Sequence, residues 1–306
     1  MSDADRLPPR LWWVLTGLTL AWGFNWSAMK VALAEVTPWV FRSLCLGLGC
    51  AVLFLVLRAR GQKLAVPAGQ WRRLMLLAFF NITCWNLLVA YGLTMIASGR
   101  AAILAYTMPV LAVPLSVWLL HERLTSRKIA GLALGLGGLA LLLGEAAAGL
   151  SGAPLGSLLA LGAAFTWALG VVLQKRYPVA MPTGPYTAWI MLLGGVPVIA
   201  GSLVFEDWRV LGGVGPKAWL GVAYNVFIAF AWAHWAWIKI ATSVSVTVFS
   251  LSMLVIPVVG VLSGMLFLGE RPSAAEYGAA ALIVAALATV ILPARAAPAP
   301  ARGSTT

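Results

Sequence analysis

Apolar runs of about 20 residues recur along the chain, and shorter stretches between them hold most of the charged residues. A helix of this length and polarity crosses the hydrocarbon core of a bilayer. The pattern therefore predicts ten membrane-spanning helices. They are expected at residues 11–33, 38–57, 74–95, 99–119, 127–145, 155–174, 184–205, 217–239, 244–268 and 275–292.

The composition supports this interpretation. The 306 residues are 61% hydrophobic and only 10% charged, whereas soluble domains average roughly 25% charged residues. The net charge of +12 would suggest a nucleic-acid partner in a soluble domain, but here Lys and Arg lie mainly between the apolar runs. We therefore expect an all-α integral membrane protein whose partner is the lipid bilayer, with no nucleic acid.

The distribution of Lys and Arg predicts the orientation. If the N-terminus lies inside, most of the 21 basic residues fall beside cytoplasmic helix ends, as the positive-inside rule requires. The outer ends keep six: Lys30, Arg42, Arg100, Arg209, Lys217 and Arg271. We expect a multi-pass protein of the inner (cytoplasmic) membrane with both termini cytoplasmic, and a disordered tail at residues 293–306 that is rich in Pro and Ala.

One stretch of the chain occurs twice. Residues 108–125, MPVLAVPLSVWLLHERLT, reappear as IPVVGVLSGMLFLGERPS at residues 256–273, a separation of 148 positions. Five helices separate the copies, and an odd number reverses the direction of the chain. The sequence thus predicts two inverted five-helix repeats (5+5), at residues 1–148 and 149–292.

Further pairs of residues support the duplication. Trp71 falls over Trp219 and Asn86 over His234 at the same separation, and Trp22 falls over Trp167 at 145. Inverted halves that exchange conformations turn an outward opening into an inward one, which is alternating access. Duplication retained for packing alone is the alternative.

With these features the chain resembles the drug/metabolite transporter superfamily, and within it the EamA-type exporters and their aromatic amino acid exporter branch. The resemblance rests on two five-helix halves, on AWGFNWSAMK at residues 21–30, and on the repeated mid-helix proline with a terminal Glu-Arg. It implies a central substrate cavity lined by helices one to four and six to nine, with helices five and ten behind. The second half departs from the pattern, since it has TWALGVVLQK at residues 166–175.

Polar side chains in membrane helices are costly, so they should face a cavity or another helix. An asparagine beside a tryptophan suits an amino acid, because the amide binds its charged ends and the ring packs on its body. Asparagines that only link helices are the alternative. The predicted substrate-binding residues are Trp22, Asn25, Asn81, Trp85, Asn86, Tyr106, Trp167, Asn225, Trp232, His234 and Ser252.

Pro109 and Pro257 are expected to act as hinges, because proline lacks an N–H and leaves a carbonyl unpaired near the middle of its helix. A static kink is the alternative. Glu122, Arg123, Glu270 and Arg271 are expected to shape the connections that follow, and Ser273 with Glu276 matches a capping box at the start of helix ten.

Catalytic motifs are missing from the sequence. It contains no GxSxG, HExxH or GxxxxGK[ST] pattern, and its three cysteines lack metal-ligand spacing. We therefore expect no enzyme, no cofactor and no metal. A channel is a further alternative, although inverted halves favour a carrier.

All nine carboxylates fall at termini, in loops or near helix ends, so none is available as a proton carrier in mid-membrane. The sequence thus favours facilitated export of small molecules, namely amino acids, including aromatic ones, and related metabolites. Proton antiport, with His234 as the titrating group, is the alternative. The sequence leaves the oligomeric state open.

Overall fold

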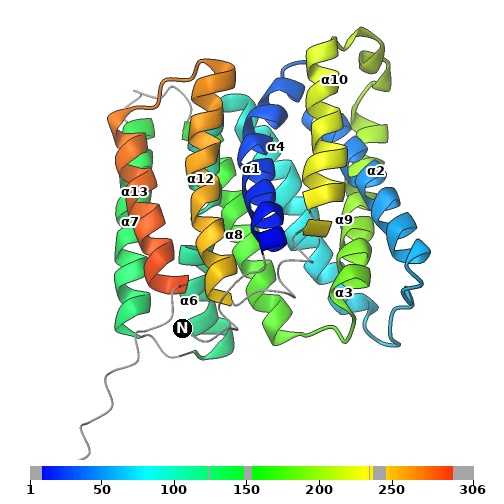
Figure 1. The fold of residues 1–306 in the computed structure, drawn as a ribbon, viewed down its shortest axis with the longest axis horizontal. Coiled ribbons are helices and arrows are strands. Elements are labelled where there is room, and N and C mark those ends of the chain that lie inside the picture. Colours follow the sequence, from blue (N-terminus) through cyan, green and yellow to red (C-terminus); the bar gives the residue numbers. More distant parts are fainter. Residues whose placement is uncertain (1–8, 123–124, 148–153, 234, 237–245, 292–306) are drawn as a thin grey trace, which may run out of the picture.

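The computed structural model describes residues 9–122, 125–147, 154–233, 235–236 and 246–291. These residues form a bundle of helices that run up and down between two faces (Figure 1). The first half holds α1 (Pro9–Ala32), α2 (Pro38–Ala59), α3 (Trp71–Ala78), η2 (Phe79–Cys84), α4 (Trp85–Met95), α5 (Ser98–Ala105), α6 (Met108–Leu120) and α7 (Ser126–Ala147). The second holds α8 (Pro154–Arg176), α9 (Thr183–Phe205), η3 (Trp208–Gly213), α10 (Pro216–Ala223), η4 (Tyr224–Trp232), α12 (Val246–Leu268) and α13 (Ala274–Ile291).

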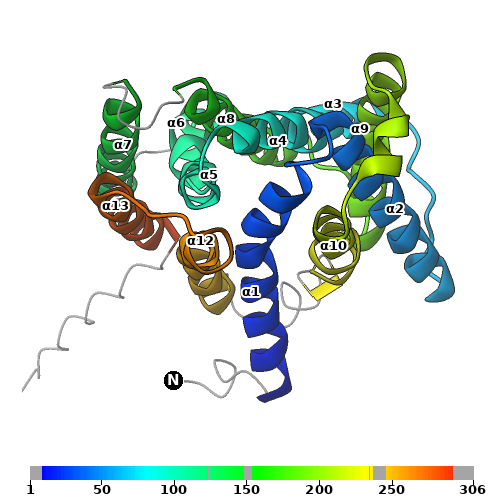
Figure 2. The same ribbon diagram turned by 90° about the horizontal axis from the view of Figure 1, so that it is seen from above.

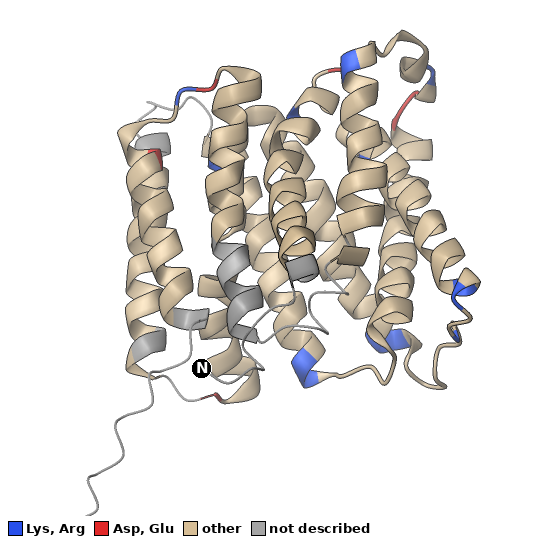
Figure 3. Ribbon diagram, in the orientation of Figure 1, with Lys and Arg blue, Asp and Glu red and all other residues tan. Residues whose placement is uncertain are grey.

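Within the described residues these elements make ten apolar segments, because α3, η2 and α4 form one continuous helix, α10 runs into η4, and α5 and α6 are two parts of one segment. Five segments are long and apolar enough, within that part of the chain, to cross a membrane: Pro38–Ala59, Trp71–Met95, Ser98–Leu120, Pro154–Arg176 and Thr183–Phe205. Lys, Arg, Asp and Glu gather towards the two ends of the bundle (Figure 3). The predicted all-α membrane fold with about ten helices is confirmed.

The packing of the helices repeats from one half to the other. α1 packs on α12 as α8 packs on α6, and α8 packs on α4 as α1 packs on α10. α2 pairs with α9, and α7 pairs with α13 at one end of the bundle (Figure 2). The α1–α12 contact thus corresponds to the α8–α6 contact, and the α8–α4 contact corresponds to the α1–α10 contact, with equivalent helices five segments apart in the chain.

The halves are inverted with respect to one another. Lys30, near the end of α1, donates to the carbonyl of Ile96, and the same Ile96 lies beside Gly156, at the start of α8. The end of α1 and the start of α8 therefore lie at the same face of the bundle. We call it the Glu270 face, which is uppermost in Figure 1, and the opposite one the Glu122 face.

The two copies of the repeated stretch end with the same backbone geometry. His121 has φ 55° and its counterpart Gly269 has φ 65°. In both copies the N–H of the following glutamate donates to a carbonyl six residues earlier, at 3.3 Å after α6 and 3.1 Å after α12. Both helices thus end at a residue in the left-handed conformation, as many helices do. The repeated Glu-Arg therefore marks a repeated chain reversal.

The hinge prolines differ between the copies. The first segment is broken at Tyr106 and Thr107, and Pro109 lies in the first turn of α6, where a missing N–H is tolerated. α12 instead continues as one helix through Pro257. The two prolines thus differ in local structure, since the helix is interrupted just before Pro109 and continues through Pro257. Their role as hinges stays a prediction.

We predict that Gly269→Ala lowers the free energy of unfolding by about 1 kcal/mol, since a left-handed backbone is strained with any Cβ. No heavy atom lies within 4 Å of the added Cβ, so sterics would not contribute. Gly212→Ala is the control, because that glycine is equally open and its φ is not positive. Thermal unfolding in detergent measures both, and an equal effect of the two variants would contradict this assignment.

Candidate functional site

A cavity of about 170 Å³ lies between the two halves. Its wall comes from α1, α2, α4, α6, α8, α9, both π-helical segments and the break at Tyr106, so that both repeats contribute. The side chains that line it are those of Trp22, Asn25, Trp26, Met29, Arg42, Ile82, Trp85, Asn86, Val89, Tyr106, Met108, Trp167, Met191, Ala229 and Phe230.

Aromatic rings from both halves form much of this wall. Trp85 of α4 and Trp167 of α8 lie with ring centroids 5.0 Å apart. Trp22, the counterpart of Trp167 in the repeat, lines the cavity too, and its indole N–H donates to the carbonyl of Ala229 at 3.3 Å. The two equivalent tryptophans thus face one space from opposite halves.

The polar part of the wall comes from four side chains: Asn25, Arg42, Asn86 and Tyr106. Asn86 donates through Nδ2 to the carbonyl of Ile82, one turn earlier, at 2.8 Å. The Oδ1 atom of Asn25 is buried and has no hydrogen-bond partner within the described residues. A buried acceptor left in this way is costly unless a ligand or water completes it.

Six of the predicted substrate-binding residues therefore meet at the cavity: Trp22, Asn25, Trp85, Asn86, Tyr106 and Trp167. Asn81 and Asn225 do not line it. Asn81 packs against Gly170 of α8, and Asn225 donates to the carbonyl of Gly221 at 3.0 Å. Both are buried, and the Oδ1 atom of each, like that of Asn25, has no hydrogen-bond partner within the described residues.

Asn81 and Trp85 lie four residues apart, and Asn225 and Trp232 lie seven apart, so a period of 3.6 residues would place each pair on one helix face. η2 and η4 are π-helical over these positions, and the wider π turn rotates the residues that follow. Trp232 consequently lines a different hollow. His234 and the side chain of Ser252 lie outside the described residues.

Arg42 was missed by the sequence analysis, which counted it among the outer helix ends. The structure buries it, at 2% exposure, in the wall of the cavity. A usable signal was present, because Arg42 lies a full turn inside the apolar run that begins at Pro38. A charged residue at such depth indicates function.

Partly and nearly buried polar contacts join the halves at the Glu270 face. The carboxylate of Glu270 accepts from the N–H groups of Ser98 (2.7 Å) and Gly99 (3.1 Å) and from the Ser98 hydroxyl (2.9 Å), and so caps α5. Arg100 pairs with Glu276 at 2.8 Å, and both side chains are nearly buried. We call Ser98, Arg100, Glu270 and Glu276 the Glu270 cluster.

Two predictions concern this cluster. The capping box is confirmed, since the Ser273 N–H donates to Glu276 and the Glu276 N–H to the Ser273 hydroxyl. Glu270 was expected to shape the connection that follows it. Its carboxylate caps a helix of the other half, where the free N–H groups of α5 stabilise an anion. Arg271 itself is exposed.

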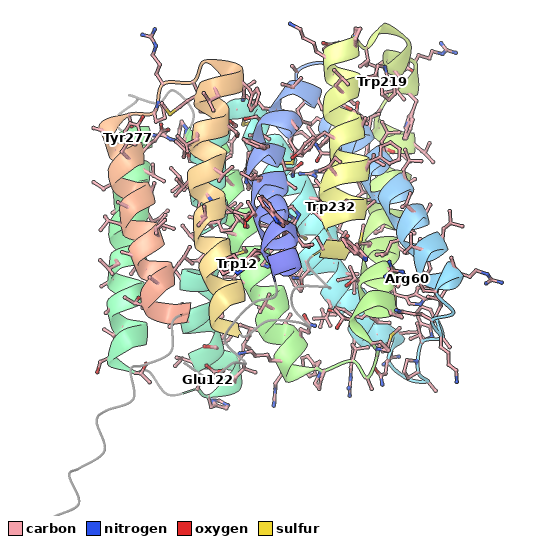
Figure 4. The ribbon with its side chains drawn as sticks, viewed as in Figure 1. Trp12, Arg60, Glu122, Trp219, Trp232 and Tyr277 are labelled. Atoms are coloured by element: carbon pink, nitrogen blue, oxygen red, sulfur yellow. The ribbon has the colours of Figure 1, made fainter. Side chains whose placement is uncertain are left out.

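The Glu122 face carries a different kind of contact. Lys175 of α8 lies 3.7 Å from the carboxylate of Glu122, and the Lys175 side chain is 65% exposed. Glu122 lies at the end of the bundle opposite Trp219 (Figure 4). Arg123 lies outside the described residues. A second hollow of about 500 Å³, between α2, α9 and η4, includes Arg60 and Trp232 in its wall.

Comparison with known proteins decides the family. The sequence model of the EamA-like transporter family matches residues 11–144 and again residues 154–292. The chain is an EamA-like transporter. It therefore belongs to a transporter family rather than to a class of enzymes, as the sequence analysis predicted.

Relatives of this transporter cover almost its whole length. A "probable amino-acid metabolite efflux pump" of Escherichia coli is 25% identical, over 88% of this chain and 91% of its own. The "uncharacterized transporter YoaV" of Bacillus subtilis is 26% identical, over 84% and 88%. A solved structure titled "Crystal structure of protein" superposes with a TM-score of 0.64 at 25% identity, covering 92% of this chain and 96% of that one.

The two ion pairs of the transporter should differ in strength. We predict that Arg100→Met lowers the free energy of unfolding by about 3 kcal/mol, since it leaves the nearly buried Glu276 without its partner. Lys175→Met, which breaks the exposed pair, should cost less than about 1 kcal/mol.

The double variant Arg100→Met/Glu276→Gln tests the coupling, because glutamine keeps the capping box and removes the charge. Its stability should lie above that of Arg100→Met alone. Thermal unfolding in detergent measures all three variants, and equal losses for Arg100→Met and Lys175→Met would contradict the assignment of a buried pair.

Proposed function

We propose that this transporter exports amino acids, including aromatic ones, and related small metabolites by alternating access. The observation that carries the proposal is the cavity between the halves, lined by Trp22 and Trp167 from equivalent positions of the two repeats. Relatives named as probable amino-acid metabolite efflux pumps support the substrate class.

The size and chemistry of the cavity suit such a substrate. Its volume of about 170 Å³ lies below the roughly 300 Å³ at which pockets for drug-sized ligands begin. The indole rings offer an apolar surface to a side chain. The unpaired Oδ1 of Asn25 supplies an acceptor for an ammonium group.

The contacts at the two faces support alternating access. Buried groups of the Glu270 cluster tie α5 to the α12–α13 connection, whereas the pair of Lys175 with Glu122 is exposed. In this proposal the Glu270 face is closed and an inverted exchange of conformations opens it. The break at Pro109 and the proline within α12, Pro257, serve as hinges.

The exposed cations support an orientation in the inner membrane. At the Glu122 face the exposed basic residues are Arg58, Arg60, Lys63, Arg72, Arg73, Lys175 and Arg176, and at the Glu270 face they are Arg209, Lys217 and Arg271, in the part of the chain that the structure describes. Lys30, Arg42 and Arg100, counted before as outer cations, donate hydrogen bonds inside the protein. The positive-inside rule then assigns the Glu122 face to the cytoplasm.

Facilitated diffusion fits the charges of the site. No Asp or Glu lines the cavity among the described residues. Proton antiport is the second candidate, with His234 as the group that would titrate.

The test is uptake of labelled amino acids by purified protein in liposomes, against empty vesicles. We expect saturable flux that a large imposed pH gradient leaves unchanged. Trp167→Ala should lower it about tenfold, since the ring forms part of the cavity wall, while Trp219→Ala, at the Glu270 face (Figure 4), should not. Absence of flux across a broad amino-acid panel would refute the substrate class, and flux that follows the pH gradient would favour antiport.

A further inference from the structure

Arg42 is a buried cation in the wall of the central cavity. It lies one turn inside α2 and is 2% exposed. Its Nε donates to the carbonyl of Asn86 at 3.2 Å and its Nη2 to the sulfur of Met29 at 3.1 Å. A thioether is a weak acceptor, so only one of these two contacts is a strong hydrogen bond.

The charge of Arg42 is not neutralised by the protein. None of the carboxylates in the described segments lies within ion-pair distance of its guanidinium, and Arg42 is the only charged residue of those segments in the cavity wall. By contrast, the equally buried Arg100 has a carboxylate partner. A desolvated cation without an anion is strongly unfavourable, so a site of this kind is completed by an anion.

We propose that Arg42 binds the carboxylate of the transported substrate. A guanidinium has five N–H donors in a planar fork that matches a carboxylate, and no hydrogen bond within the described residues uses Nη1. The same cavity holds the rings of Trp85 and Trp167 for the body of the substrate. This inference rests on the proposed export function. It narrows the substrates of the transporter to molecules that carry a carboxylate, namely amino acids and aromatic monocarboxylates.

A purely structural role is the competing explanation. In that role Arg42 would only tie α2 to α4 through the Asn86 carbonyl and to α1 through Met29. Such a structural role uses two N–H donors of Arg42 and does not require the ligand to carry a carboxylate. The two explanations therefore differ in one observable, which is how far binding depends on a carboxylate.

The first measurement uses the unaltered protein, and so does not depend on the folding of a variant. Tritiated L-phenylalanine and tritiated 3-phenylpropanoate are bound to the purified transporter, and L-phenylalaninamide and phenethylamine compete with them. We expect both carboxylates to bind, and the two compounds that lack a carboxylate to be at least about tenfold weaker. Equal affinity for L-phenylalanine and its amide would overturn the inference.

The second measurement assigns the preference to Arg42. Arg42→Gln should bring the affinity ratio of acid to amide close to one, and Arg42→Lys should retain part of it, since lysine keeps the charge but lacks the fork. Arg209→Gln is the matched control, because Arg209 is exposed at the Glu270 face, outside the cavity. A ratio that persists in Arg42→Gln would overturn the inference.

The outcomes separate this inference from the proposed function. Amino-acid flux without preference for a carboxylate would leave the export function standing and refute the role of Arg42. Binding of 3-phenylpropanoate that depends on Arg42, without amino-acid flux, would support the carboxylate site and refute the amino-acid substrate. If neither carboxylate binds, the inference fails.

Discussion

The Glu270 carboxylate at the start of α5 is the interaction on which the arrangement of the halves depends. It comes from the second repeat and accepts hydrogen bonds from N–H groups of the first, in a partly buried position. Arg100 of α5 and Glu276 of α13 add a nearly buried ion pair beside it. Because such groups are costly when separated, these contacts hold the two halves together at the Glu270 face.

The cost of unpaired polar groups also bears on the cavity, where such groups are left unpaired. Around it the protein leaves polar groups incompletely paired, namely the Oδ1 of Asn25 and the guanidinium of Arg42. Indole rings from both repeats form another part of the same wall. A small molecule with a charged end and an apolar body would complete both parts of the wall, which links the packing of the halves to transport.

Much of the fold could be predicted from the sequence, because long apolar runs permit few structures in a bilayer. The 148-residue separation also located the matched chain reversals at His121 and Gly269. The residues of the site were harder to predict, since the site depends on the direction in which each side chain points. Two π-helical segments turn Asn81 and Asn225 out of their expected positions, and no pattern of 3.6 residues reveals that. Arg42 was misplaced because the positive-inside rule counts charges without regard to burial.

Central to this account is a single cavity exposed to one face at a time. Counterflow tests it most directly: liposomes preloaded with unlabelled L-phenylalanine are diluted into a trace of the labelled compound. We expect a transient accumulation of label above its equilibrium level. A cavity that opens to one face at a time carries unlabelled L-phenylalanine out and labelled L-phenylalanine in. Label that only approaches equilibrium, at a rate independent of the preload and linear in concentration, would indicate an open channel and contradict the account.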